Sequence, residues 1–260
     1  MKIAEALRLL EAREARLLLS EATGFSQAAL VGFPERILTD EAERRFVEFA
    51  ERRMKGEPVA YIVGHKEFYG LDLAVNPAVL IPRPETELLV DLALARPFTS
   101  ALDLGTGSGA VALALKKNRP SAKVTAVEAS AAALAVAQHN AVKHNLDVEF
   151  RHGRWFAPVA GERFGVIVAN PPYVAAEDPH LPDLRYEPLS ALVSGADGLD
   201  DIKAIVAEAR GALEEAGWLL LEHGIGQDVE VRGLLERAGL EEVRTWPDLS
   251  GIPRVSGGRR

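Results

Sequence analysis

Apolar residues recur along the first fifty positions with the period of a helix. From Ile3 to Ser20 they return every three or four residues, with glutamate and arginine between them, which predicts one amphipathic helix. A later helix is predicted to begin at Thr39 or Asp40, since either side chain can cap it. We expect a helical bundle over residues 1–57, which we interpret as a region for substrate or partner recognition. The predicted buried stripe of the later helix consists of Phe46, Val47, Phe49 and Ala50.

The pattern changes between residues 58 and 82. Short strand-like runs alternate there with glycine and asparagine turn residues, which is typical of a β-hairpin. We interpret this stretch as a linker. Pro82 and Pro84 follow it and would stiffen the entry to a helix over about residues 85–95.

From residue 99 onward, short apolar runs alternate with helical patterns. This alternation predicts a parallel sheet with helices on both faces, within a domain of residues 83–260. Residues 256–260 are expected to form a frayed tail. Strands are predicted near 100–104, 123–127, 147–151, 164–169 and 217–222, with two further runs at 240–246 and 252–256. Helices are predicted near 109–117, 130–144, 199–215 and 226–238.

The composition is that of an ordinary globular protein. The chain has 260 residues, of which 48% are hydrophobic and 26% are charged. No run approaches roughly 18 apolar residues, and the first residues lack the apolar core of a secretory signal, so we expect neither a membrane span nor secretion. The absence of cysteine fits a cytoplasmic protein. The six histidines show no metal-ligand spacing, so no bound metal is expected.

The net charge of −8 argues against nucleic acid as the direct substrate. A protein whose affinity depends on phosphate contacts usually presents a basic face. Arginines do gather between residues 44 and 53, but glutamates alternate with them. That mixture is typical of a solvated helix surface with ion pairs.

A glycine-rich loop follows the first predicted strand of the sheet. Its glycines would let a ligand approach the backbone, and the helix predicted after it offers free N–H groups. The spacing G-x-G-x-G is tighter than that of dinucleotide enzymes and favours a ligand without a pyrophosphate, such as S-adenosylmethionine (SAM). Asp103, just before the loop, would accept hydrogen bonds from loop amides or from the SAM amino group. The loop residues are Gly105, Thr106, Gly107, Ser108 and Gly109.

The next predicted strand ends at Glu128, where an acid can accept hydrogen bonds from ribose hydroxyls. A solvated strand end would be the alternative if the glycine loop were absent. With the loop present, we interpret Glu128 as a cofactor ligand.

Asn170, Pro171, Pro172 and Tyr173 follow a short apolar run. Each proline fixes φ and lacks an N–H, and Pro171 also restricts Asn170, so the turn is stiff and leaves carbonyl oxygens free. A planar amino group could donate one proton to the Asn170 side-chain oxygen and the other to the Pro171 carbonyl. Tyr173 would cover one face of that plane and leave the other open to an electrophile. A rigid loop without a role is the alternative.

Together these motifs resemble those of class I SAM-dependent methyltransferases that act on a planar nitrogen. Residues 80–87, Leu-Ile-Pro-Arg-Pro-Glu-Thr-Glu, further resemble the signature of HemK-type release factor glutamine methyltransferases. The resemblance covers the chain from about residue 54 to its end. Further matching segments are residues 61–64, 68–71, 187–188, 195–199 and 221–224.

The resemblance implies a Rossmann-like, seven-stranded methyltransferase sheet whose last two strands form an antiparallel edge hairpin. It implies methyl transfer from SAM, leaving S-adenosylhomocysteine, to the glutamine amide nitrogen in the Gly-Gly-Gln motif of a peptide chain release factor. Asn170, Pro171 and Tyr173 would be catalytic, and Pro172 would contact the substrate with them. Arg83 and Glu85 are weaker substrate-site candidates. We expect a monomer.

Trp155 follows the third strand, where this fold packs an apolar side chain against adenine. In the family the preceding residue is usually acidic, whereas here it is Arg154, which can only donate hydrogen bonds. The adenine amino group would therefore need another acceptor. Residues 174–194 form a long polar segment, which we interpret as a flexible flap over the substrate.

Other functions remain open at this point. A glutamine methyltransferase of a ribosomal protein would carry nearly identical motifs. An adenine-N6 methyltransferase of nucleic acid would use the same turn but should show a basic channel. A non-catalytic SAM-binding scaffold would not need the Asn170 turn, and a nicotinamide dehydrogenase would have a different glycine spacing.

Overall fold

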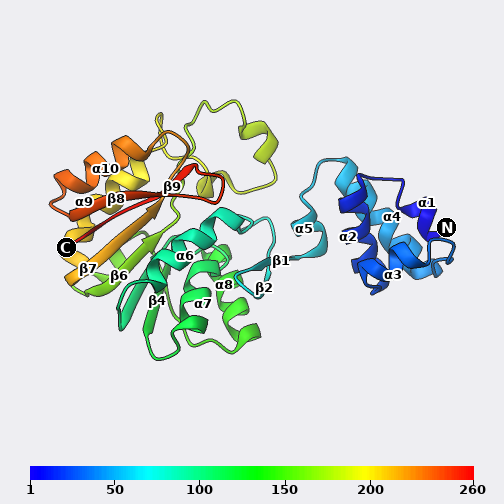
Figure 1. Cartoon of the computed structure of the whole chain (residues 1–260), viewed down its shortest axis with the longest axis horizontal. Helices are drawn as coiled ribbons and strands as arrows, with labels where there is room; N and C mark the ends of the chain where they lie inside the picture. Colours follow the sequence, from blue (N-terminus) through cyan, green and yellow to red (C-terminus); the bar gives the residue numbers. More distant parts are fainter. The chain divides into compact units, whose positions relative to one another are not determined.

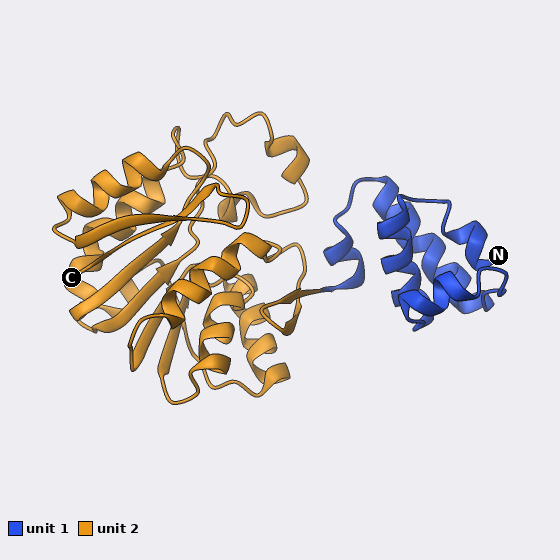
Figure 2. Cartoon of the chain, in the orientation of Figure 1, with its two compact units in different colours: residues 1–65 blue, residues 66–260 orange.

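The computed structural model describes residues 1–260, which form two compact units (Figure 2). The first unit comprises Met1–His65 and the second Lys66–Arg260. The borders at residues 57 and 82 that the sequence indicates stay a prediction, because compactness does not define the limits of a functional domain. No helix of the structure has both the length and the apolar surface that a membrane crossing requires.

The first unit is a bundle of short helices around its own apolar core. Ile3, Leu18, Leu30 and Phe46 are fully buried in that core. The helices are α1 (Ile3–Ala6), α2 (Ala12–Thr23), α3 (Gln27–Gly32), α4 (Asp40–Met54) and α5 (Val59–Val63).

The predicted continuous helix from Ile3 to Ser20 is wrong. The chain leaves α1 after Ala6, and α2 begins at Ala12, where the side chain of Glu11 accepts two backbone N–H groups as a cap. The apolar period continues across this break because residues on both sides face the same core. Periodicity alone therefore does not reveal the interruption.

Helix α4 shows most of the predicted stripe. Thr39 caps it, its hydroxyl accepting a backbone N–H at 3.2 Å. Phe46, Phe49 and Ala50 are buried, as their spacing of three and four residues predicts. The prediction for Val47 is wrong, since this residue is 37% exposed. It lies about 100° around the helix from Phe46 and so points away from the core.

The predicted hairpin is present as β1 (His65–Phe68) and β2 (Leu71–Ala74), which pair with each other. The strand-like pattern predicted at the start of this stretch is wrong, because residues 59–63 form helix α5. The turn residues of the hairpin, Tyr69 and Gly70, both have positive φ, 50° and 72°. A two-residue turn of this kind matches the twist of the strands that it joins. After the hairpin, a short 3-10 helix, η1 (Pro84–Thr86), leads into α6 (Glu87–Leu94).

The second unit is built on a seven-stranded sheet (Figure 1). The strand order is β5-β4-β3-β6-β7-β9-β8, and β9 alone runs in the direction opposite to the other strands. The predicted α/β class with a mostly parallel sheet is confirmed. The strands are β3 (Ser100–Leu104), β4 (Lys123–Glu128), β5 (Glu149–His152), β6 (Phe164–Ala169), β7 (Leu213–Glu222), β8 (Glu241–Pro247) and β9 (Pro253–Arg259).

The end of the chain confirms one expectation and contradicts another. The last two strands form the expected antiparallel hairpin at the edge of the sheet, with β9 next to β7 and β8 outermost. The predicted frayed tail at residues 256–260 is wrong, because β9 continues to Arg259 and Ser256 is fully buried. Gly257 explains the close fit, since a Cβ there would lie 2.5 Å from the Leu219 carbonyl oxygen.

Helices cover both faces of the sheet (Figure 1). Helices α6, α7 (Ala110–Asn118) and α8 (Ala131–His144) pack on one face. Helices α9 (Asp200–Ala212) and α10 (Asp228–Arg237) pack on the other. Because both faces are covered, β6 consists of apolar residues and one glycine, and β3 has only Ser100 and Asp103 as polar residues.

This topology places a crevice at one edge of the sheet. The chain passes from β3 to β4 on one side and later to β6 on the other side. Ligands of doubly wound sheets bind beyond the carboxyl ends of the strands at such a reversal. The residues directly after β3, β4 and β6 therefore meet at one place.

Candidate functional site

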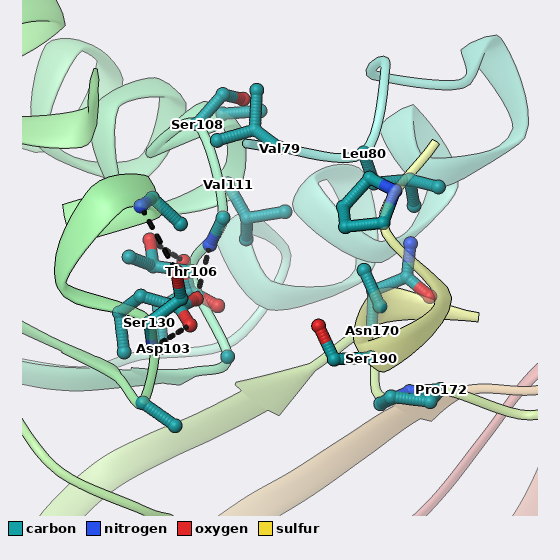
Figure 3. Close-up of a pocket in the computed structure, with 18 of the residues that line it drawn as sticks. Val79, Leu80, Asp103, Thr106, Ser108, Val111, Ser130, Asn170, Pro172 and Ser190 are labelled. Atoms are coloured by element: carbon teal, nitrogen blue, oxygen red, sulfur yellow. Dashed lines mark hydrogen bonds between the residues drawn. The ribbon is translucent and has the colours of Figure 1, made fainter. Parts of the chain in front are cut away.

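A cavity of about 380 Å³ opens at this place, and its size is within the range of small-ligand sites. Asp103 and Thr106 lie on one side of it, and Asn170, Pro172 and Ser190 lie opposite (Figure 3). The glycine loop, the end of β4 and the Asn170 turn were predicted separately from the sequence, and they line the same cavity. The cavity is also lined by Leu80, Pro82, Arg83, Thr86, Glu128, Ser130, Arg154, Trp155, Pro188 and Asp201.

The glycine loop needs its glycines for two reasons. Gly105, Gly107 and Gly109 have positive φ values of 72°, 56° and 85°, which other residues adopt at a cost. A Cβ at Gly105 would also approach the ring of Trp155 to 3.3 Å. The N–H groups of Gly105 and Thr106 both donate to the Val127 carbonyl, at 2.9 and 3.1 Å, which fixes the loop to β4.

Asp103 holds the loop from beneath. Its Oδ2 accepts the Thr106 hydroxyl at 2.6 Å and the Ala112 N–H of α7 at 3.1 Å. Burial raises the pKa of Asp103 to about 6, and those two hydrogen bonds oppose the shift. The carboxyl therefore fastens the loop to the helix, and it also lines the cavity.

Glu128 stands at the end of β4 with both carboxylate oxygens oriented. Oε2 accepts the Gly107 N–H at 2.9 Å, and Oε1 accepts the Ser130 N–H at 2.8 Å. Each oxygen keeps a further lone pair for a ligand. The acid is thus held in place by the loop that it faces.

Trp155 and Arg154 form the next part of the wall. Trp155 has φ 48°, and its buried Nε1 has no hydrogen-bond partner. Arg154 donates to the Asp201 carboxylate of α9 at 2.6 Å. Asp201 lines the same cavity, so an acid lies beside Arg154 in this wall.

The Asn170 turn is fixed at both ends. The Asn170 Nδ2 donates to the Thr86 hydroxyl at 3.2 Å, which leaves its Oδ1 free of that contact. Pro171 is buried and does not line the cavity, whereas Asn170 and Pro172 do. The Tyr173 hydroxyl lies 3.4 Å from Glu222 Oε1, and its ring packs against the core under α9 and α10. Burial raises the pKa of Tyr173.

The two substrate-site candidates of residues 80–87, Arg83 and Glu85, differ in their position relative to the cavity. Arg83 lines the cavity and pairs with Glu187, whose Oε2 also accepts the Ile81 N–H at 3.0 Å. Glu85 is exposed and lies outside the cavity lining. The structure therefore brings Arg83, but not Glu85, to the candidate site.

Residues 174–194 return to the cavity. Val174 and Val193 form an isolated bridge, and the Ser194 N–H donates to the Val174 carbonyl at 3.0 Å. Residues 188, 190, 191 and 193 line the cavity, so the returning part of the segment forms one of its walls. Motion of this segment as a flap stays a prediction.

Four side chains near the site were not identified as candidates from the sequence: Thr86, Glu187, Asp201 and Glu222. Thr86 contacts Asn170 across 84 positions, and Glu187 contacts Arg83 across 104. No local spacing connects such pairs. Three of the four lie within or beside segments of the resemblance, but the resemblance does not say what they contact.

Two family models match the chain. The methyltransferase small domain matches residues 84–182, and the PrmC N-terminal domain matches residues 3–64.

Three similar proteins carry the name release factor glutamine methyltransferase. The protein of Burkholderia pseudomallei is 46% identical over 274 residues, covering 98% of this chain and 95% of its own. That of Yersinia pestis is 49% identical over 95% of this chain and 91% of its own. That of Xylella fastidiosa is 51% identical over 80% of this chain and 78% of its own.

Solved structures resemble the chain at lower identity. A methyltransferase from Pyrococcus furiosus has a TM-score of 0.59 and 19% identity, covering 80% of this chain and 96% of that one. A 16S rRNA methyltransferase of T. thermophilus in complex with AdoMet and guanosine has a TM-score of 0.57 and 21% identity, covering 75% and 49%. At these identities the likeness shows a shared fold alone.

Proposed function

The chain belongs to the release factor glutamine methyltransferase family, and we propose that it methylates the glutamine amide nitrogen in the Gly-Gly-Gln motif of a peptide chain release factor, with SAM as methyl donor. One observation carries the assignment of the site. Asn170 lines the cavity opposite the glycine loop, and its Nδ2 is occupied by Thr86. Its oxygen is thereby available to a donor from the substrate.

The residues around the cavity fit SAM. Glu128 offers two oriented carboxylate oxygens for the ribose hydroxyls, and the indole of Trp155 offers an apolar wall for a ring. The backbone at Gly105 and Gly107 carries no side chain that would keep a ligand away. Asp201 pairs with Arg154, which stands where the family has an acid, and it also lines the cavity, so we assign it to the adenine amino group.

Bound SAM supplies a methyl group that its sulfonium has already activated. The amide nitrogen of glutamine is a poor nucleophile because its lone pair is delocalised into the carbonyl. The Asn170 Oδ1, on the cavity wall, would accept a hydrogen bond from one N–H of this amide. The Pro171 carbonyl, which lies behind the cavity lining, would accept the other once the amide reaches the turn. Both contacts would raise the electron density on the nitrogen and orient it. Positioning of this kind can contribute up to roughly 7–11 kcal/mol in model reactions.

The reaction does not require a strong general base from the protein. Once the new N–C bond has formed, the nitrogen is positively charged and acidic, so its surplus proton leaves without a strong general base. Tyr173 would bound one face of the substrate plane, and Arg83 would contact the substrate beside the turn. These two roles extend the assignment from Asn170 to its neighbours.

Substitution Asn170→Ala tests this assignment. We expect methyl transfer to fall by at least ~100-fold, as for the loss of other positioned hydrogen-bonding groups in active sites. SAM affinity should stay within a few-fold, because the cofactor contacts lie on the glycine loop and β4. The measurement is transfer of labelled methyl from SAM to a purified release factor, with binding followed by calorimetry.

Two controls make the result specific. Asn118→Ala removes an exposed asparagine of α7 that bonds only within its own helix and should leave transfer unchanged. A release factor with the Gly-Gly-Gln glutamine replaced should accept no label. Label on neither factor, with SAM bound normally, would contradict the proposed substrate and favour a ribosomal protein or a nucleic acid.

A further inference from the structure

Glu222 is a buried acid with no part in the mechanism above. It is the last residue of β7, is 2% exposed, and does not line the cavity. Its Oε2 is buried without a hydrogen-bond partner. A buried carboxyl oxygen without a partner is costly and calls for an explanation.

The groups that face Glu222 come from three elements. Thr86 and Glu85 belong to η1, Tyr173 follows β6, and Arg254 belongs to β9. Burial raises the pKa of Glu222 to about 7. The hydroxyls of Thr86 and Tyr173 and the charge of Arg254 oppose this shift, while Glu85 adds to it. Arg254 is itself paired with Asp248 at 3.2 Å, so Glu222 is not its sole counter-ion.

Residues at both ends of the Asn170 turn are connected to the Glu222 carboxyl, one directly and one through Thr86. Tyr173, at one end, places its hydroxyl 3.4 Å from Glu222 Oε1. Asn170, at the other end, donates to the Thr86 hydroxyl at 3.2 Å. Thr86 is only 4% exposed, and its oxygen already accepts from Asn170, so its own proton needs an acceptor. The Glu222 carboxyl interacts with the Thr86 side chain, and its Oε2 has no other partner, so it can be this acceptor.

We propose that Glu222 is a positioning residue that receives the protons of Thr86 and Tyr173 and thereby orients both ends of the Asn170 turn toward the methyl-accepting amide. This inference rests on the proposed function, because it assigns Asn170 its substrate contact.

The direction of the hydrogen bonds is what matters. An asparagine side chain presents either an acceptor or a donor to the cavity, depending on which way its amide is turned. A turned amide would set an NH2 group against the NH2 group of the substrate. If Glu222 is the final acceptor, Thr86 donates its proton to Glu222 and Asn170 donates an amide proton to Thr86. The Asn170 NH2 group then points away from the cavity, and its oxygen points toward the cavity.

Substitutions at Thr86 test the hydrogen-bond chain while the side chain of Glu222 itself stays unchanged. Thr86→Val removes the hydroxyl but keeps the shape, and we expect kcat for the release factor to fall about 10-fold, the effect of one lost hydrogen bond. Thr86→Ser keeps the hydroxyl and should stay within about 2-fold of wild type. KM for SAM should change in neither variant. Equal kcat for the valine and serine variants would overturn the proposal.

Substitutions at Glu222 test the acceptor itself. Glu222→Gln introduces two donors without acceptors, and we expect a loss of about 10-fold in kcat. In the double variant with Thr86→Val the losses should not multiply, since both act through one chain of contacts. Losses that multiply would contradict the proposal. The matched control is Glu215→Gln, at an exposed position of the same strand, with no loss expected.

A readout without substrate separates this inference from the proposed function. The side-chain amide signal of Asn170 in a ¹⁵N–¹H spectrum, assigned by its loss in Asn170→Asp, should shift in Glu222→Gln and not in Glu215→Gln. An unmoved signal would refute the positioning role whatever the substrate is. A moved signal together with an unmethylated release factor would support the positioning role and refute the substrate.

Discussion

Asp103 and Glu222 are carboxyls of the same chemistry in two different surroundings. Asp103 accepts two close hydrogen bonds, and burial raises its pKa to about 6. Glu222 has one long contact and one oxygen without a partner, and burial raises its pKa to about 7. Both groups bind a proton more readily in the folded than in the unfolded chain. Folding therefore becomes less favourable as the pH rises through the range between their unfolded and folded pKa values.

Substitution Glu222→Gln should remove one of these contributions. The acid adds stability below its unfolded pKa of 4.5, and this is lost as the pH rises toward 7. The unfolding free energy of the variant relative to wild type should therefore increase from pH 4.5 to pH 8, by up to roughly 3 kcal/mol. Urea unfolding across this range is the measurement. For Glu215→Gln we expect a difference in unfolding free energy that does not change with pH. The same result for Glu222→Gln would contradict a raised pKa of Glu222 in the folded protein.

At the residue scale, sequence predicted best where the role depends on position along a strand. Glu128 ends β4 and Asn170 directly follows β6, the two strands that flank β3 in the parallel part of the sheet, so their meeting followed from the alternation of elements alone. The partners of these residues did not follow. Thr86 and Asp201 contact the site from segments that no spacing connects to it.

At the scale of elements, the positions of strands and helices in the second unit were predictable because both faces of the sheet are covered. Continuous apolar runs then mark strands, and caps and glycines mark their ends. The extension of the last strand through residues 256–259 was not predictable. Residues 256–259 contain two glycines and two charged or polar residues, a composition typical of a tail, yet they form an inner strand.

Substitution Gly257→Ala should show how tightly that strand fits. A Cβ there would meet the Leu219 carbonyl at 2.5 Å and a Leu220 methyl at 2.7 Å, so we expect a loss of about 1–3 kcal/mol in unfolding free energy. Gly211→Ala is the matched control, because nothing lies within 4 Å of its Cβ and alanine favours the helix. Thermal or urea unfolding compares the two. Equal stability would mean that β9 tolerates a wider spacing.

At the scale of the whole molecule, the cavity and the helical bundle belong to different units. Every residue that lines the cavity falls between positions 78 and 201, within the second unit. The bundle of residues 3–64 matches a domain model of its own. Its role in recognising the substrate protein stays a prediction, as do the monomeric state and the cytoplasmic location.

Removal of the first unit should separate cofactor binding from substrate recognition. For a chain of residues 66–260 we expect SAM affinity within a few-fold of the full chain, because the lining residues are all retained. If the bundle recognises the release factor, KM for that substrate should rise by at least ~10-fold. Calorimetry and transfer of labelled methyl give the two values. An unchanged KM would refute the recognition role.

The sequence by itself determined the alternation of strands and helices, the glycine loop and the stiff Asn170 turn, because each depends on the local chemistry of glycine, proline and apolar periodicity. Only the tertiary structure decided that Thr86 turns the Asn170 amide, that Asp201 holds Arg154 and that β9 lies inside the sheet. Those contacts join residues that lie far apart along the chain. Their energies depend on burial and on hydrogen-bond partners that exist only once the layers have packed.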